Sequence, residues 1–563
     1  MIFYDFEVFE YDWLVVLINP DKQTEDVIIN DSATFTKYYE DNKDDIWVGK
    51  NNVGYDQFIK RAIICGFNPK KVNDHIIVKG KSGWQFSSMF SKIPCIEYDI
   101  GLPTYSLKQL EGFMGDKIKE TSVPFDIDRK LTEKEIAETV EYCKHDVYEA
   151  MKVFMLTVNE FNASLNLINT FKLPLSYISK TKAQLSAIII GCNRKNWNDE
   201  FDITIVDTLR IGKYKPILDW FKKCKFYDEN FEFEVAGVKH TFGIGGVHGA
   251  KENYHSKGLI IHVDVNSYYP SLMIRYGLLT RNCSNPKKYE DIYNTRLALK
   301  KEGKKKEQAP YKIVLNATYG IFKDKYSSAY DPRQANNVCV NGQLLLIDLI
   351  DKLEAIEGFE LIQSNTDGLI VKIPDTDNHF NQLDDLCHEW EKRTGMGLGF
   401  DLIDEIWQKD VNNYIFRDVD GNLERKGAYV KELNELDNNL PIVNKAIVDY
   451  LTQGTPIETT INTCDDLKQF QMICKITSKY KCLIHGNVQL SERCVRVFAS
   501  KRSTDGGLYK LHQNKIKPDK FPSTPEHCFI ENEDVNGMKV PLKLDREFYI
   551  NMAKERVSGY GLV

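Results

Sequence analysis

The chain opens with alternating apolar and polar residues, a pattern that predicts two neighbouring strands over residues 2–8 and 13–18. Apolar residues then recur at helical spacing in three segments, which are residues 35–41, 56–65 and 133–158. Strands followed by helices are typical of a layered α/β domain, here of roughly 160 residues.

The pattern continues through the middle of the chain, where a glycine-rich stretch precedes a strong strand. The predicted elements are this strand over 259–265, a charged helix over 287–306, a helix over 341–356, a hairpin over 360–371 with its turn near 365–368, and an amphipathic helix over 545–557. The chain is therefore predicted to be a multidomain protein of α/β and α+β class.

Composition narrows the classes of protein. The 563 residues are 42% hydrophobic and 28% charged, which excludes a mostly disordered or fibrous chain. The net charge of −7 argues against nucleic-acid binding through overall positive charge, although residues 287–306 carry a local excess of five positive charges. The 13 cysteines form no Cys-x-x-Cys pair, and neither a signal peptide nor a membrane span is visible. We expect an intracellular, cytoplasmic protein that is a monomer and does not bind a membrane.

Carboxylates are placed unusually in the first 150 residues. Asp5 and Glu7 lie two apart on one predicted strand and therefore share a face. Asp56 opens a predicted helix, and Tyr142 lies one helical turn before Asp146. If these acids converge, their repulsion requires cations, and two Mg²⁺ or Mn²⁺ ions would suit both the oxygen ligands and the hydrolysis of a phosphodiester. Each short motif alone also occurs by chance in long chains.

In this order, the motifs resemble the three exonuclease motifs of proofreading DNA polymerases, over residues 1–160. The resemblance implies an RNase-H-like domain with 3′–5′ exonuclease activity. Asp5, Glu7, Asp56 and Asp146 would be catalytic metal ligands, and Tyr142 would orient the attacking water.

Two further segments match the same family. Ser106 and Leu107 begin a Ser-Leu-x-x-hydrophobic motif that implies binding of a single-stranded primer end. Lys130 stands where phage members keep a catalytic lysine, which would stabilise charge on the phosphate. A solvent-exposed lysine at a helix start is the alternative for Lys130.

The segment Asp264-Val-Asn-Ser-Tyr-Tyr-Pro-Ser follows the predicted strand and resembles the first polymerase motif of family B DNA polymerases, with Tyr268 in place of Leu. Asp264 and the Val265 backbone would hold metal. The turn at Ser267 and Tyr268 would direct backbone amides at a triphosphate. The resemblance implies that Tyr269 lies beneath the sugar and leaves no room for a 2′-hydroxyl.

A second motif of the same family is matched by Lys312, Asn316 and Tyr319, which fall on one stripe of a helix. Lys312 would contact the triphosphate as a catalytic cation, and the other two would bind the nucleotide. Arg296 and Lys300 resemble the Arg-x-x-x-Lys pair of the first finger helix, with a solvated helix face as the alternative.

The segment Gln-Ser-Asn365-Thr366-Asp367-Gly368 resembles the third motif, Tyr-x-Asp-Thr-Asp-Ser, but departs from it. Asn365 replaces the first Asp and Gly368 replaces the last Ser. The retained Asp367 would share both metal ions with Asp264, and Thr366 would contact DNA. Two acids suffice if the triphosphate supplies further oxygens.

Four more residues match segments that imply contact with primer–template DNA. These are Gly245 and Gly246 of a Gly-rich motif, Tyr414, and Lys426. For the glycines, a simple turn is an equal alternative.

The resemblance implies six regions along the chain. They are an exonuclease domain (1–160), a connecting region with N-terminal palm (161–258), palm (259–285), short fingers (286–322), palm (323–430), and thumb with the C-terminal region (431–563). The intervals from Asp264 to Lys312 and from Asn316 to Asp367 are 48 and 51 residues, too short for the insertions of protein-primed phage members.

The prediction is a compact phage-type DNA polymerase that extends a primer 3′-hydroxyl with dNTPs and proofreads. It would use two Mg²⁺ or Mn²⁺ ions per active site, and a helicase, single-strand-binding protein or clamp as partner. Two alternatives stay open: a 3′–5′ nuclease with a degenerate polymerase-like body, and a DNA-binding replication factor without catalysis.

Overall fold

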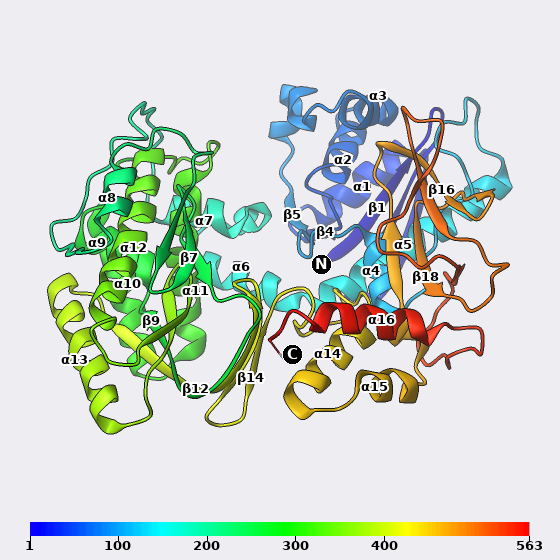
Figure 1. Cartoon of the computed structure of the whole chain (residues 1–563). Coiled ribbons are helices and arrows are strands. Elements are labelled where there is room, and N and C mark those ends of the chain that lie inside the picture. The colour runs from blue at the N-terminus through cyan, green and yellow to red at the C-terminus, as the bar shows by residue number, and fades with distance from the viewer. Residues whose placement is uncertain (562–563) are drawn as a thin grey trace. The chain divides into compact units, whose positions relative to one another are not determined.

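The computed structural model describes residues 1–561, which form two compact units. The first unit consists of residues 1–179, 433–443 and 458–551, and the second of residues 180–432, 444–457 and 552–561. Figure 1 shows the elements of both. Among the described residues, no helix has both the length and the apolar composition to cross a membrane.

The first unit is built on a five-stranded sheet in the order β3-β2-β1-β4-β5. The strands are β1 (Ile2–Val8), β2 (Trp13–Asn19), β3 (Thr24–Ile29), β4 (Ile46–Gly49) and β5 (Ile96–Asp99). β1 runs antiparallel to β2 and parallel to β4. The two strands predicted at the start of the chain are confirmed, and this order is that of an RNase-H-like fold.

Helices cover both faces of this sheet. They are α1 (Ser32–Asn42), α2 (Asp56–Ile64), α3 (Pro69–Asn73), α4 (Leu107–Met114), α5 (Glu133–Leu156) and α6 (Val158–Thr170). Tyr4 and Phe6 of β1 pack with Phe58 of α2 on one face. Phe3 packs with Val147 of α5 on the other. Odd-numbered residues of β1, including Asp5 and Glu7, therefore face α5.

The C-terminal part of the first unit contains two small sheets. One has the order β15-β18-β21 (Met472–Lys475, Cys494–Ala499, Cys528–Ile530). The other has the order β17-β16-β19-β20 (Val488–Gln489, Tyr480–His485, Leu508–His512, Asp519–Lys520). The helices here are α15 (Ile457–Thr463) and the first half of α16 (Arg546–Val557), which passes into the second unit after residue 551. These residues, grouped with the thumb from sequence, thus share a compact unit with residues 1–179.

The second unit is built on a nine-stranded sheet in the order β14-β13-β12-β9-β11-β10-β8-β7-β6. Its strands are β6 (Phe231–Val235), β7 (Val238–Phe242), β8 (His248–Ala250), β9 (Tyr254–Val265), β10 (Glu360–Ser364), β11 (Gly368–Lys372), β12 (Leu398–Asp410), β13 (Asn413–Asp418) and β14 (Leu423–Lys426). The predicted strand and hairpin are confirmed as β9 and as β10 with β11.

Two helices of the second unit differ in their bounds from the prediction. They are α7 (Lys182–Ile189), α8 (Lys215–Phe221), α9 (Tyr268–Arg275), α10 (Pro286–Lys301), α11 (Lys305–Lys323), α12 (Pro332–Leu353), α13 (Asp377–Thr394) and α14 (Pro441–Gln453). The charged helix predicted over 287–306 is interrupted, because Gly303 has a φ of +70° between α10 and α11. The prediction for α12 began nine residues late. The mixed α/β multidomain class is confirmed.

Candidate functional site

Four carboxylates predicted from sequence gather beside β1 of the first unit. Asp5 and Glu7 come from β1, Asp56 from the first turn of α2, and Asp146 from α5. The backbone N–H of Phe6 donates to Oδ1 of Asp56 at 3.2 Å, which ties the helix start to the strand. Asp56 is 4% exposed and Glu7 is 7% exposed.

The electrostatics of these groups reflect one another. Burial, followed by repulsion from Asp56, Glu7 and Asp146, raises the pKa of Asp5 well above its ordinary value. Burial also raises the pKa of Glu7, again with a contribution from the neighbouring acids. For Asp56, burial raises the pKa to about 7. Such acids stay ionised at neutral pH only where positive charge compensates them, so divalent cations with oxygen-ligand preference fit this cluster.

One lysine already lies among the acids, and it is Lys108 of α4. Its Nζ lies 2.5 Å from Oδ1 of Asp146 and 2.9 Å from Oε1 of Glu111. The same ammonium lies 4.7 Å from the ring centre of Tyr142. Burial, followed by the charges of Asp146, Glu7 and Asp5, raises the pKa of the Tyr142 phenol, which therefore remains a proton donor.

Lys130 lies elsewhere. It is exposed, two residues before the Thr132 cap of α5, and contacts none of the four acids among residues 1–561. Sequence reasoning gave Lys108 no role, although it follows Ser106 and Leu107 directly.

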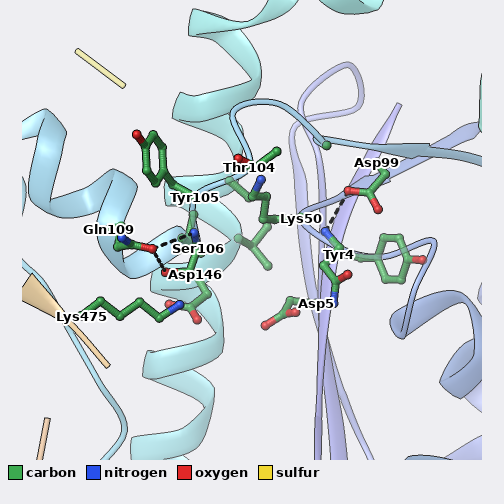
Figure 2. A pocket seen from close by; sticks show the side chains of 15 residues that line it. Tyr4, Asp5, Lys50, Asp99, Thr104, Tyr105, Ser106, Gln109, Asp146 and Lys475 are labelled. Carbon is green, nitrogen blue, oxygen red and sulfur yellow. Dashed lines mark hydrogen bonds between the residues drawn. The ribbon is translucent and has the colours of Figure 1, made fainter. Parts of the chain in front are cut away.

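A cavity of about 610 Å³ adjoins the acids (Figure 2). Asp5 and Asp146 line it together with Ser106 and Leu107, as do Lys50 and Lys475, which sequence reasoning missed. Ser106 caps α4, and its backbone N–H and hydroxyl both bond to Oε1 of Gln109, at 3.4 and 3.2 Å.

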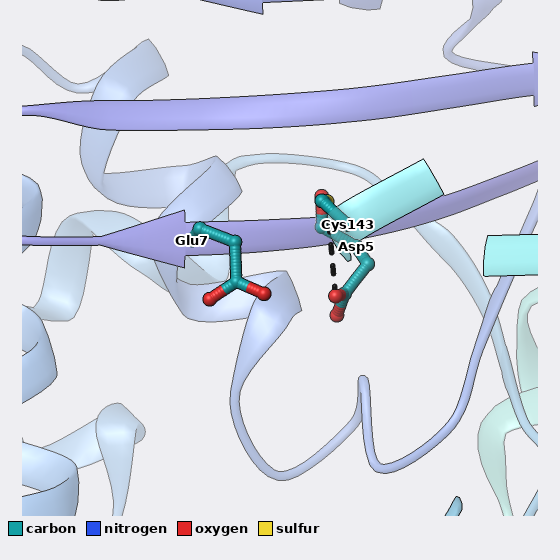
Figure 3. Close-up of side chains that lie close together, drawn as sticks. All are labelled: Asp5, Glu7 and Cys143. Atoms are coloured by element: carbon teal, nitrogen blue, oxygen red, sulfur yellow. Dashed lines mark hydrogen bonds between the residues drawn. The ribbon is translucent and has the colours of Figure 1, made fainter. Parts of the chain in front are cut away.

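A cysteine completes the inner wall of the cluster. Sγ of Cys143 lies 3.4 Å from the backbone oxygen of Asp5 and 3.8 Å from its Oδ2 (Figure 3). Ligand atoms of Asp5, Glu7 and Cys143 all lie within 4.8 Å of one another. Burial raises the pKa of this thiol, which keeps it protonated and unsuited to binding a hard cation.

The segments that resemble the first and third polymerase motifs lie side by side in the nine-stranded sheet of the second unit. Asp264, near the end of β9, is paired in register with Gly368 of β11 and Gly399 of β12. The backbone N–H of Val265 donates to the backbone oxygen of Asp367 at 2.9 Å. Burial, followed by the charge of Asp367, raises the pKa of Asp264. Two neighbouring carboxylates, one near the end of β9 and one in the turn directly before β11, also fit divalent cations.

Asn365, which replaces the Asp of the family motif, takes part in the hydrogen bonds of the turn between β10 and β11. Its backbone N–H donates to the Gly368 oxygen at 2.9 Å, and its Oδ1 accepts the Thr366 N–H at 2.8 Å. A Cβ on Gly246 would lie 3.6 Å from Oγ1 of Thr366, so that glycine lies close to the turn, whereas Gly245 borders open space.

Next to Asp264 the chain turns sharply into α9. Ser267 has φ 49° and ψ 51°, and its hydroxyl accepts a bond from Nη1 of Arg296 at 2.5 Å. The Tyr268 hydroxyl donates to the Gly342 oxygen at 2.5 Å. The ring of Tyr269 packs against the ring of Tyr319, with centres 4.4 Å apart. These contacts fix the turn and its two tyrosines in place.

The remaining predicted residues of this unit are mostly solvent-facing. Lys300, Lys312 and Asn316 are exposed on α10 and α11. Tyr414 is buried on β13 and pairs in register with the exposed Lys426 of β14.

Comparison with known proteins identifies similarity to DNA polymerases over part of the chain. The chain is 26% identical over 198 residues to DNA polymerase 1 of Sulfurisphaera ohwakuensis. It is 25% identical over 202 residues to DNA polymerase 1 of Saccharolobus solfataricus. Each match covers 34% of this chain and 21% of the relative, so the alignment spans about a fifth of each curated protein.

Among solved structures, the family B DNA polymerase from the hyperthermophilic archaeon Pyrobaculum calidifontis aligns over 99% of this chain and 77% of its own, with a TM-score of 0.43 and 14% identity. No family model matches the chain. The resemblance to DNA polymerases predicted from the motifs is confirmed by these curated relatives.

Proposed function

We propose that this protein is a DNA-directed DNA polymerase that extends a primer 3′-hydroxyl with dNTPs and removes mismatched ends through a separate 3′–5′ exonuclease site. The observation that carries the proposal is the closeness of two carboxylates, Asp264 near the end of β9 and Asp367 directly before β11, beside a turn that Arg296 holds.

At the polymerase site, Asp264, Asp367 and the Val265 carbonyl would hold two Mg²⁺ or Mn²⁺ ions, whose chemistry is to acidify the primer hydroxyl and neutralise the triphosphate. The Ser267–Tyr268 turn would direct its backbone amides at the phosphates.

The nucleotide itself would be bound by side chains from two elements. The Tyr269 ring, packed on Tyr319, would close the space that a 2′-hydroxyl needs. Lys312 and Asn316 are exposed on α11, and Lys300 on α10, as contacts with the triphosphate require. Lys426, Gly245, Gly246, Thr366 and Tyr414 would contact the primer–template.

At the exonuclease site, Asp5, Glu7, Asp56 and Asp146 would hold the ions that activate water. The Tyr142 phenol would orient that water. The cavity lined by Ser106 and Leu107 would receive the single-stranded primer end. Lys130, which is exposed just before α5, would contact the phosphate of the substrate.

The short intervals around the second motif support a compact, phage-type enzyme that uses an ordinary primer and needs a helicase, single-strand-binding protein or clamp for long synthesis. The predicted division into palm, fingers and thumb is part of the proposal.

Primer extension tests the proposal. We expect wild-type protein to extend a labelled primer with dNTPs but not with NTPs. Asp264→Asn should lose extension and keep single-strand degradation, whereas Asp5→Asn should show the converse. Degradation without extension would favour a nuclease with an inactive polymerase-like body. Binding without either reaction would favour a replication factor without catalysis.

A further inference from the structure

A short helical region after α2 concentrates positive charge in a chain that is negative overall. It consists of α3, η1 (Asp74–Val78), η2 (Gly83–Gln85) and η3 (Ser88–Lys92). Between Pro69 and Lys92 there are five lysines and one aspartate, whereas the whole chain carries −7. We refer to this region as the α3–η3 surface.

Most of these lysines are available to an external anion. Lys70 is engaged, since its Nζ lies 2.8 Å from Oδ1 of Asp74. The other four are exposed, and none has a carboxylate within ion-pair distance in the described part of the chain. They are Lys71, Lys79, Lys81 and Lys92.

An exposed aromatic ring stands among the lysines. Trp84 is 49% exposed. Its ring lies 5.0 Å from the guanidinium of Arg61 and packs edge-on against Phe58, with ring centres 5.0 Å apart. Arg61 is itself buried and donates to the Phe90 oxygen at 3.1 Å. A Cβ on Gly83 would lie 2.3 Å from the Phe58 ring, so the residue before the tryptophan must be glycine for this packing.

Internal contacts connect the middle of the α3–η3 surface through His75. The Lys81 N–H donates to the His75 oxygen at 3.1 Å, and Nε2 of His75 lies 3.2 Å from the Ser82 oxygen. The His75 ring also packs against Phe86 at 5.4 Å. These contacts join η1 to the segment that carries Lys81 and Trp84.

The α3–η3 surface begins beside the carboxylate cluster. Tyr55, which directly precedes Asp56, donates its hydroxyl to Oδ1 of Asn73 at 2.8 Å, and Asn73 is the last residue of α3. A strand whose end reaches Asp56 would have this surface next to it.

We propose that the α3–η3 surface binds single-stranded nucleic acid, with a base stacked on Trp84 and phosphates near Lys79, Lys81 and Lys92. A flat, supported aromatic ring recognises an unstacked base, and unpaired lysines neutralise a polyanion. A duplex hides its base faces, so the ring favours single strands. The inference rests on the proposed exonuclease function, whose substrate end is single-stranded.

Photocrosslinking reads out the surface directly. The probe is an oligothymidylate of about 20 nucleotides that carries iododeoxyuridine, bound to the full chain in EDTA so that no cleavage occurs. We expect mass spectrometry to find the crosslink on the peptide that contains Trp84. Trp84→Leu, which keeps an apolar cover over Phe58, should abolish this crosslink, and Trp84→Phe should retain part of it.

Charge is tested by binding at several salt concentrations. Lys79→Glu with Lys81→Glu should weaken oligothymidylate binding and reduce the slope of log Kd against log salt by about 1.4, because each single-strand contact contributes about 0.7. The matched control reverses two exposed lysines elsewhere on the first unit, Lys37→Glu with Lys172→Glu, and should leave both quantities unchanged.

Primer extension by the same preparations separates the two ideas. If wild-type protein extends primers and binds the oligonucleotide but gives no crosslink at Trp84, the inference is wrong while the polymerase proposal stands. Binding of phosphatidylserine–phosphatidylcholine vesicles that depends on Trp84, without a crosslink to the oligonucleotide, would likewise overturn it in favour of a membrane surface.

Discussion

Arg496 is expected to hold the two sequence-distant parts of the first unit together. This arginine on β18 is fully buried, and its guanidinium makes five hydrogen bonds. One goes to Oε1 of Gln471, two to the backbone oxygens of residues 531 and 533, and two to the backbone oxygens of Gly112 and Asp116. The last two lie at the C-terminal end of α4, the helix that carries Lys108.

Replacing Arg496 by Leu removes all five bonds, and the acceptors, which are buried or part-buried, lose the guanidinium as donor. Each such group costs about 1–3 kcal/mol. Part of this cost is offset because the charged guanidinium no longer has to be desolvated, a burden that lowers the pKa of Arg496 to about 10. A hydrogen bond from a charged donor contributes about 1.5–3 kcal/mol, so five lost bonds less this offset give an expected destabilisation of about 3–5 kcal/mol.

Urea unfolding followed by circular dichroism measures this loss as a midpoint about 1 M or more below that of wild type. Two of the lost bonds hold the end of α4, the helix that carries Lys108. In the Arg496→Leu protein, single-strand degradation should therefore be lost at a lower urea concentration than primer extension. Arg493→Leu is the matched control, since Arg493 is partly exposed and donates only to nearby backbone oxygens such as that of Thr477 at 2.8 Å. An Arg496→Leu protein within about 1 kcal/mol of wild type would refute the reasoning.

Three further predictions concern charge at the two sites. Lys108→Met removes the cation that compensates Asp146, so the more negative cluster should bind Mn²⁺ several-fold more tightly, as titration calorimetry would measure. Lys108→Arg keeps the charge and should bind Mn²⁺ about as wild type does. An unchanged Mn²⁺ affinity of Lys108→Met would exclude this role for Lys108. The pKa of Asp56 is raised to about 7 by burial, so the folded chain holds a proton that the unfolded chain releases, and metal-free stability should fall as pH rises from about 4 to about 7. Asp56→Asn should flatten that fall, and Mg²⁺ should raise the melting temperature more at pH 8 than at pH 5, whereas an equal gain would contradict the assignment. Asn365→Asp should keep the Thr366 bond and lower the Mg²⁺ concentration for half-maximal extension; a higher requirement would argue against metal binding there.

Local patterns predicted the elements whose side chains alternate between core and solvent. The strand β1 and the hairpin of β10 with β11 were found at nearly their true bounds. The start of α12 was missed because several of its buried residues are polar and interrupt the apolar spacing. Asn337 and Asn341 accept hydrogen bonds from the backbone N–H groups of Thr204 and Val206, at 2.8 and 2.9 Å. Hydrophobic periodicity does not predict such polar partners.

The same limit applies to the sites. Acids were predicted correctly as neighbours where a motif places them on strands or helix starts, as with Asp5 and Asp146. Lys108 was not assigned to the cluster, because only the packing of α4 against α5 brings its ammonium to Asp146. The hydrogen bonds from Arg496 to Gly112 and Asp116 likewise join residues more than 370 positions apart in the chain, and a local sequence pattern cannot predict such contacts.

Asn365 shows how the second unit can depart from its motif and keep its geometry. An aspartate at this position would accept the Thr366 N–H as Asn365 does, at 2.8 Å, so the turn does not require the charge. The charge would however act on Asp264, whose pKa burial and Asp367 already raise. With asparagine, fewer negative charges must be compensated before a nucleotide brings its own phosphates to the site. The first unit has the opposite balance, since four acids there face one lysine, and its demand for divalent cations should therefore be the greater of the two.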